Sequence, residues 1–246
     1  MVRYTHYMAK DIKFTPLFDN VIEMFYPKPS SEYIPDWYKN QSPYTNDKRH
    51  VNDNGVINST IKKCIPVFDS ITAGYIIVTC MDIEIEKKDD GSYYKWARAF
   101  KSSLGVVEPI VFHRSEQADK HPFFSYGTNP PKFTNPWSIQ TPKGYSTLFI
   151  TPMHRDLPFE ILPGIVDTDR HISEVNFPFF LKDPNWSGMI PAGTPIAQVI
   201  PFKRDAWKKS IGGKKEKEKA IKATQTILLF FSNAYKTLFW SKKSFK

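Results

Sequence analysis

The chain has 246 residues, of which 15% are aromatic, and it contains twenty prolines against eleven glycines. This length is ample for a buried core in one large domain, and the aromatic content excludes a largely disordered chain. The N-terminus lacks the apolar region of a secretory signal, and no run approaches the ~18 apolar residues of a membrane span. We therefore expect an intracellular protein without a transmembrane segment.

The net charge of +9 is unevenly distributed along the chain. Residues 203–246 hold thirteen of the 34 basic residues and three of the 25 acidic ones, which gives this segment a charge of +10. The other 21 basic and 22 acidic residues leave the body at −1. The basic excess therefore belongs to a C-terminal appendage and gives no evidence for a basic cleft in the body.

Residues 1–58 are predicted to form an extended, irregular arm rich in proline and tyrosine. Prolines at 27, 29, 35 and 43 interrupt any helix or strand, and the neighbouring aromatic residues would anchor the arm on a surface. A peptide ligand for a proline-recognition module is the alternative, although such ligands need a longer exposed proline run.

A short helix is expected over 59–75, closed by Gly74. The run that follows predicts a strand over 76–86, in which apolar residues alternate with Asp82, Glu84 and Glu86 on a solvated face. A turn at 90–91 would make it a hairpin. The two cysteines, Cys64 and Cys80, are expected to be reduced and buried, because neither lies in a CxxC motif.

From residue 105 to 202, short apolar runs alternate with proline, glycine and asparagine. Strands of four to eight residues with a turn signal about every ten residues are typical of a β-barrel or β-sandwich. The runs span 105–114, 137–142, 144–152, 159–167, 173–181 and 194–202. The sequence therefore predicts a mostly β core domain over residues 59–204.

Residues 205–246 are predicted to form a basic, helical C-terminal tail. A Gly212-Gly213 break and a Lys/Glu run precede apolar residues near helical spacing, namely Ile227, Phe230, Phe231, Leu238 and Phe239. Three roles stay open. The apolar face packs on its own domain or on a symmetry mate, which we favour because exposed phenylalanines are unfavourable; or the helix binds a membrane surface; or it contacts nucleic acid or another polyanion weakly and non-specifically.

Two motifs resemble the trimeric dUTPase and dCTP deaminase family over residues 141–202. They are Gly164-Ile165-Val166-Asp167-Thr168-Asp169 and Gly193-Thr194-Pro195-Ile196-Ala197-Gln198, and "TPKGYSTLFITP" at 141–152 is similar to the strand before that family's phosphate-binding turn. The resemblance implies a dUTPase-like β-clip, a compact wrapped β-barrel or sandwich that trimerises.

This sequence departs from the family where the phosphates would bind. The expected Arg-Ser-Gly turn is replaced by Met153-His154-Arg155-Asp156, and an acidic side chain beside a triphosphate is unfavourable without an intervening metal. Arg170-His171 replaces the aromatic residue expected beside the sugar. We therefore expect the fold without dUTPase activity.

Residues 34–204 also resemble, more diffusely, a family of uncharacterised proteins in tailed phages and some bacteria. The similar stretches are "IPDWYKN", "TIKKCIPVFDSITAGYI", "NPWSIQTPKGYSTLF" and "GTPIAQVIPFKR". This resemblance implies a virion protein or one of the host cytoplasm, partnered by other copies or other virion proteins.

Candidate catalytic residues are Asp167 and Asp169, whose side chains would point to one side of a strand with Thr168 opposite. The alternative is a structural turn in which an aspartate binds backbone amides. Candidate ligand-binding residues are Tyr145, His154, Arg155, Asp167, Arg170 and Gln198. No metal site is expected, because neither the HxD at 154–156 nor the two histidines of "FHRSEQADKH" have a complete ligand set.

The sequence favours a non-catalytic phage-type structural or binding protein, a homo-oligomer with a trimer as first choice. The alternative is an enzyme or sensor that binds a nucleotide or small polar ligand around Asp167 and Gln198, with Mg²⁺ as a cofactor in that case alone. A cavity lined by Tyr145, Arg155, Asp167 and Gln198 would favour the alternative.

Overall fold

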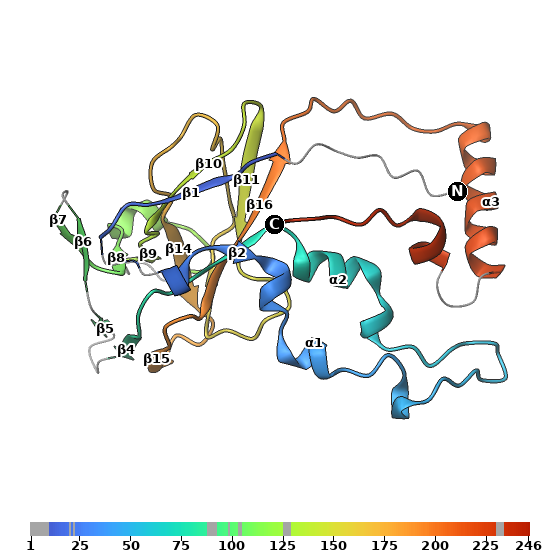
Figure 1. Cartoon of the computed structure of the whole chain (residues 1–246), viewed down its shortest axis with the longest axis horizontal. Helices are drawn as coiled ribbons and strands as arrows, with labels where there is room; N and C mark the ends of the chain where they lie inside the picture. The colour runs from blue at the N-terminus through green and yellow to red at the C-terminus, as the bar shows by residue number, and fades with distance from the viewer. Residues whose placement is uncertain are drawn as a thin grey trace. The chain divides into compact units, whose positions relative to one another are not determined.

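The computed structural model describes residues 10–19, 21, 23–87, 93–97, 99–102, 105–124, 129–229 and 234–246 (Figure 1). Two compact units divide the chain: residues 1–28 with 74–204, and residues 29–73 with 205–246. The division at residue 204 coincides with the start of the predicted tail, whereas residues 59–73 lie in the second unit.

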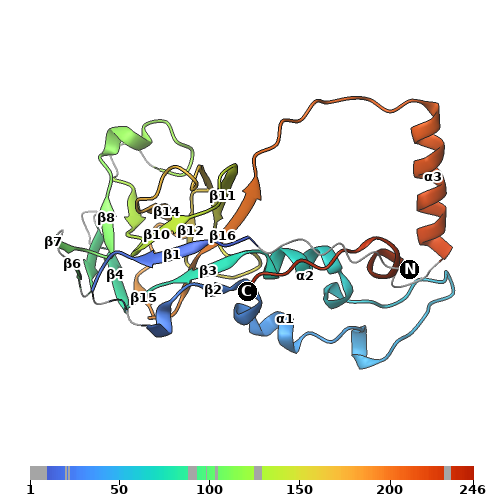
Figure 2. The same cartoon turned by 45° about the horizontal axis from the view of Figure 1, so that its top comes forward.

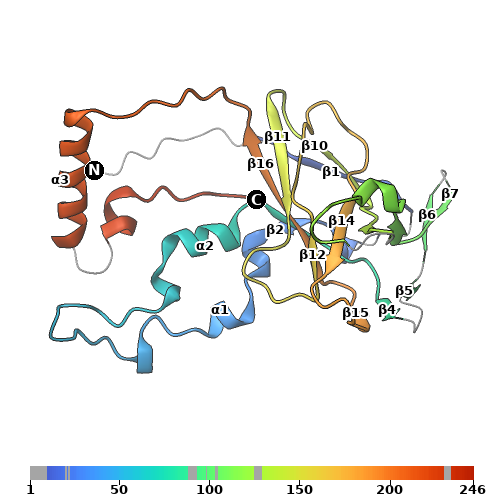
Figure 3. The same ribbon diagram turned by 180° about the vertical axis from the view of Figure 1, so that it is seen from behind.

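The first unit is built from antiparallel β-sheets, and its largest sheet has the strand order β13-β11-β16-β3-β2. Its strands are β13 (Gly164–Val166), β11 (Tyr145–Ile150), β16 (Pro195–Lys203), β3 (Tyr75–Val78) and β2 (Lys28–Pro29). Strands β11 and β16 run side by side from the Tyr145–Lys203 pair to the Ile150–Gln198 pair (Figures 1 and 3). On its other edge β11 pairs with β13, so β11 lies between the two motifs that the sequence singled out.

The smaller sheets of the first unit are also antiparallel. One has the order β12 (Phe159–Ile161), β14 (Phe177–Leu181), β9 (Pro131–Phe133) and β8 (Ile110–Phe112); another has β15 (Gly188–Ile190), β4 (Ile83–Lys87) and β5 (Tyr93–Trp96). The pairs are β1 (Lys13–Pro16) with β10 (Trp137–Gln140), visible in Figure 2, and β6 (Phe100–Ser102) with β7 (Gly105–Val107). The predicted mostly β fold is confirmed at this level, and no sheet of the described strands closes into a barrel.

The core of the first unit is aromatic and aliphatic. The rings of Phe133 and Phe179 stack with centroids 4.1 Å apart, and Phe159 lies edge-on to Phe133 at 4.9 Å. All three are at most 1% exposed. Strands β12, β14 and β9 each contribute one of these rings, so the alternating apolar runs of the sequence bury their inward side chains as predicted.

The prediction of one long strand over 76–86 is wrong in part. The chain forms β3 and β4 in different sheets, with a break between Val78 and Ile83. Every residue of β3 is buried, so both faces of this strand are covered, whereas β4 alternates and exposes Glu84 and Glu86 as predicted. Strand β4 pairs with β5 as the expected hairpin, whose predicted turn at 90–91 lies outside the described residues.

The helix predicted over 59–75 is shorter in the structure. A 3-10 turn, η4 (Ile61–Lys63), precedes α2 (Ile65–Thr72), because Pro66 is tolerated only in the first turn of a helix. Gly74 follows the helix with φ of +69°, as its predicted closing role requires. The thiols of Cys64 and Cys80 are free and half-buried, and burial raises the pKa of Cys80 to about 12.

The predicted irregular arm contains short regular elements as well. Strand β1 pairs with β10, and α1 (Asp36–Asn40) begins directly after Pro35. The remaining short turns of the chain are η1 (Glu23–Phe25), η2 (Ser30–Tyr33), η3 (Thr45–Asp47) and η5 (Ser115–Ala118). The arm could not be predicted to supply β1 because a strand of four residues on a sheet edge has little apolar periodicity.

The second unit contains the helical tail, as predicted. It forms α3 (Lys214–Leu229) and a single π-helical turn, η6 (Tyr235–Phe239). The end of the tail is attached to α2: Asp69 accepts hydrogen bonds from the Trp240 indole at 2.9 and 3.1 Å and from Lys243 at 2.6 Å. We refer to these three residues as the tail latch.

Within the second unit, Ala234 is buried and Trp240 is half-buried, while the larger apolar side chains described on the tail helices stay exposed. Ile227, Leu238 and Phe239 are 41%, 42% and 49% exposed, and Phe230 and Phe231 lie outside the described residues. The packing that we favoured, on the chain's own domain or on another copy, stays a prediction. Among the described residues, no helix has the length and apolar character needed to cross a bilayer.

Candidate functional site

The two candidate aspartates lie in a tight turn directly after β13. The backbone amides of Arg170 and His171 both donate to the carbonyl of Asp167 at 2.9 Å, which closes the turn. Thr168 points to the opposite side and is fully buried. Both carboxylates face one partner, Arg204, so the predicted arrangement of the side chains holds although the backbone is a turn and not a strand.

A cluster of three hydroxyl groups holds this turn in place on the side opposite the two carboxylates. Thr168 Oγ1 lies 2.7 Å from Thr141 Oγ1 and 2.8 Å from Thr147 Oγ1. Thr141 precedes β11 and Thr147 lies on it, so the cluster ties the turn to the central strand of the sheet. All three residues are buried, which makes each hydroxyl dependent on the others for hydrogen bonds.

Arg204, directly after β16, binds both carboxylates. Its Nη1 donates to Asp169 Oδ1 at 2.8 Å and lies 3.1 Å from Asp167 Oδ1, while its Nη2 donates to Asp169 Oδ2. The guanidinium group also donates to the Ser146 hydroxyl at 3.1 Å and to the Tyr145 carbonyl at 3.0 Å. A forked guanidinium across a carboxylate gives a strong, directional pair.

The two carboxylates differ in exposure and in their other partners. The side chain of Asp169 is 2% exposed and also accepts the Gly144 amide at 2.8 Å. The side chain of Asp167 is 52% exposed and accepts the Ser146 hydroxyl at 2.6 Å. Asp169 is therefore enclosed by donors, and Asp167 keeps one side towards solvent.

These hydrogen bonds shift the acid–base equilibria of all three groups. The Arg204 guanidinium, and then the Gly144 amide, hold the pKa of Asp169 well below its usual range. The Ser146 hydroxyl is the largest cause that lowers the pKa of Asp167, and the charge of Arg204 adds to it. The hydrogen bonds that Arg204 donates to Asp169 raise the pKa of Arg204. All three groups therefore stay charged at neutral pH, which excludes either carboxylate as a general acid there.

Gln198 and the predicted phosphate region lie at the other end of β11. Gln198 pairs with Ile150, four residues along the strand from Ser146, which is about 13 Å. Its side chain is buried, and Oε1 accepts the Met153 amide at 3.0 Å, so it holds the turn after β11. His154, exposed with φ of +59°, and half-exposed Arg155 follow in this turn.

The structure thus divides the predicted site residues into two groups. Tyr145, Asp167, Asp169 and Arg170 meet at the first end of β11, where the positive charge of Arg170 further lowers the pKa of Asp169. The ring of half-exposed Tyr145 lies 5.1 Å from the Lys10 ammonium group. His154, Arg155 and Gln198 belong to the second end.

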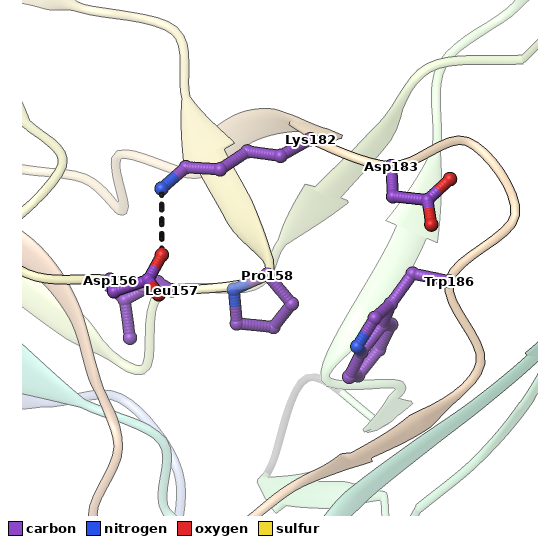
Figure 4. A pocket seen from close by; sticks show the side chains of 6 residues that line it. All are labelled: Asp156, Leu157, Pro158, Lys182, Asp183 and Trp186. Carbon is purple, nitrogen blue, oxygen red and sulfur yellow. Dashed lines mark ion pairs between the residues drawn. The ribbon is translucent and has the colours of Figure 1, made fainter.

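A pocket of about 330 Å³ lies beside the second group but is lined by other residues (Figure 4). Its walls are Asp156, Leu157, Pro158, Lys182, Asp183 and Trp186. Lys182 and Asp156 form an ion pair at 3.7 Å across one side, and both side chains are well exposed. This pocket is not the cavity that would favour a ligand around Asp167 and Gln198, because neither residue lines it.

Sequence reasoning missed Arg204, which belongs to the "GTPIAQVIPFKR" stretch. The signal that could have found it is a basic residue directly after the strand that carries the second motif, residues 193–198. Within the described residues, no group of three histidine, cysteine, aspartate or glutamate side chains could hold a metal ion. Asp167 offers the accessible carboxylate of this site, but Ser146 and Arg204 already contact its Oδ1.

No protein-family model matches the sequence, and a comparison with curated proteins gives no match.

Proposed function

We propose that this chain is a non-catalytic structural or binding protein of phage type, built on a dUTPase-like β-clip that has lost nucleotide hydrolysis. The observation that supports the loss is the position of Arg204. Its guanidinium group occupies the space between Asp167 and Asp169, where a catalytic pair would have to hold water or a metal ion. The aspartates instead close one end of the sheet.

The environment of Gln198 supports the same conclusion. A side chain that contacts a ligand has to line an accessible cavity. Here Gln198 is 1% exposed and hydrogen-bonded to the turn after β11. The phage-type assignment rests on the sequence resemblance, as do the host cytoplasm or the virion as its location and other virion proteins as its partners.

Nucleotide hydrolysis is the direct test. Purified protein at micromolar concentration is incubated with dUTP or dCTP and Mg²⁺, and released pyrophosphate or ammonia is measured beside a known dUTPase. We expect no turnover. Turnover that disappears in Asp167→Asn would contradict the proposal and establish an enzyme.

A melting screen separates ligand binding from catalysis. A nucleotide at 100 times its dissociation constant would stabilise the folded state by about 2.7 kcal/mol. We expect no such shift with dUTP, dCTP or their monophosphates, with or without Mg²⁺. A shift that Asp167→Asn abolishes, without turnover, would favour the sensor alternative, for which the half-exposed Asp167 side chain is the supporting feature.

We further propose that the protein is a homo-oligomer, with a trimer as first choice. The edge strand β13 exposes Ile165, and oligomers of β proteins commonly cover such edges. Light scattering at tens of micromolar should give about three times the chain mass of 28.5 kDa. A monomer would contradict this assembly without affecting the hydrolysis result.

A further inference from the structure

The basic tail combines positive charge with solvent exposure. Residues 208–222 contain seven lysines and two glutamates. Every described position of α3 from Lys214 to Ile227 is exposed except Ala223, which is half-buried. The lysines of α3 take no part in any ion pair found among the described residues. Their charge is therefore available to a partner.

The same segment exposes large apolar side chains. Trp207 is 91% and Ile211 is 88% exposed, just before α3. On the tail helices the exposed apolar residues are Ile221, Ile227, Tyr235, Leu238 and Phe239. At about 25 cal/mol per Å² of apolar surface, leaving so many in water is unfavourable, so we expect a surface that covers them.

The order of residues on α3 separates three of its five lysines from the apolar side chains. At 100° per residue, Lys215, Lys219 and Lys222 fall within one 60° sector. Ala220, Ile221 and Ile227 fall on the opposite half, which also carries Lys214 and Lys217 in the first turn. Beyond the first turn, this separation is typical of a helix that lies parallel to an apolar–polar boundary.

Charge and apolar exposure together discriminate between partners. A nucleic acid backbone would pair with the lysines but offers no apolar volume for Trp207 or Ile211. A second copy of this chain would offer apolar surface but little negative charge, because its body carries 22 acidic and 21 basic residues. An anionic bilayer surface supplies both, with phosphates for the lysines and an interfacial zone for tryptophan and isoleucine.

We propose that residues 207–229 bind the surface of an anionic lipid bilayer, with α3 lying in the plane of the interface. The helix has sixteen residues and is therefore about 24 Å long, which suits a surface position. Gly212 and Gly213 precede it, so its direction can adjust to the surface. The tail latch attaches the chain that follows this segment to α2, so binding of α3 tethers the second unit to the surface.

Vesicle co-sedimentation of the full chain tests this proposal. The vesicles contain either phosphatidylcholine alone or phosphatidylcholine with about one third phosphatidylglycerol, at 50 and 500 mM salt. We expect binding to the anionic vesicles at low salt, weaker binding at high salt, and little binding to neutral ones. A competing DNA duplex of equal phosphate concentration should not displace the vesicles.

Two variants separate the charged from the apolar contribution. Lys215→Gln/Lys219→Gln/Lys222→Gln should lower the partition coefficient about 100-fold, at about fivefold for each lysine near the surface. Trp207→Ala/Ile211→Ala should lower it about tenfold or more at unchanged charge. Lys48→Gln/Arg49→Gln, which removes two exposed charges elsewhere in the same unit, is the control for a general loss of charge and should change it less than twofold.

Each possible result either supports the binding of lipid or overturns it. Anionic binding that both tail variants weaken, while the control does not, supports the proposal. Binding to DNA without binding to vesicles would assign the tail to nucleic acid. Binding that Trp207→Ala/Ile211→Ala leaves unchanged, or no binding at all, would also overturn the lipid assignment.

Discussion

Replacing Thr168 by valine should destabilise the fold, although the two side chains have almost the same shape. Thr168 is fully buried, and its hydroxyl is bonded to those of Thr141 and Thr147. Thr141 retains a longer bond of 3.3 Å to the Tyr145 carbonyl, but the buried Thr147 hydroxyl loses the hydrogen bond that holds it in this cluster.

The size of the effect follows from that unpaired group. Leaving a buried hydroxyl unsatisfied costs about 1–3 kcal/mol of the free energy of unfolding. For a chain of this size each kcal/mol lowers the melting temperature by about 2–4 °C. The loss should appear as a lower urea midpoint with an unchanged slope, measured by tryptophan fluorescence.

A double variant and a surface control make the measurement specific. Thr147→Val/Thr168→Val removes both partners, so it should be less destabilised than the sum of the two single variants. Thr226→Val makes the same chemical change on exposed α3 and should alter stability by less than about 0.5 kcal/mol. Full stability of Thr168→Val, or strict additivity in the double variant, would refute the role of the hydroxyl cluster.

Three further predictions concern the charge cluster, the tail latch and one close backbone contact. The pKa of Asp169 is lowered in the folded state, so its contribution to stability is complete above about pH 4 and is lost as the pH falls towards its folded pKa. Urea midpoints measured between pH 6 and 2.5 should therefore fall less steeply in Asp169→Asn than in the wild type. Asp69→Ala removes the acceptor of Trp240, so trypsin should cleave the C-terminal residues faster while the melting of the β unit stays unchanged; equal cleavage rates would contradict the latch. Gly74→Ala should prevent correct folding or strongly destabilise the fold, because a Cβ there would lie 2.0 Å from a backbone oxygen of β16. Gly55→Ala is the control: Gly55 has a similar φ of +73° and nothing within 4 Å, so this change should lower the free energy of unfolding by only about 1–2 kcal/mol. Similar losses of stability in the two variants would contradict the close contact.

The strands of residues 105–202 could be predicted because their signals are local. Apolar runs bounded by proline and glycine gave β10, β11, β14 and β16, whose side chains pack on the core side as expected. The prediction was wrong where the burial of side chains did not follow the apolar alternation of the sequence. Strand β3 is buried on both faces, so the alternation inferred for 76–86 could not apply to it. Strand β9, with proline and lysine in three residues, carries almost no pattern of its own.

The candidate site was harder to predict than the strands, because the residues that form it are far apart in the sequence. Asp169 and Arg204 are brought together by strand order alone: β13 and β16 both run antiparallel to β11, on its two sides. Their C-terminal ends therefore lie at the same end of β11, near Ser146, and the residues that follow them meet there. Gln198 lies earlier on β16, so the same geometry carries it away from the aspartates. An acidic motif after one flanking strand and an arginine after the other thus predict an ion-pair clamp, once the strand between them is known.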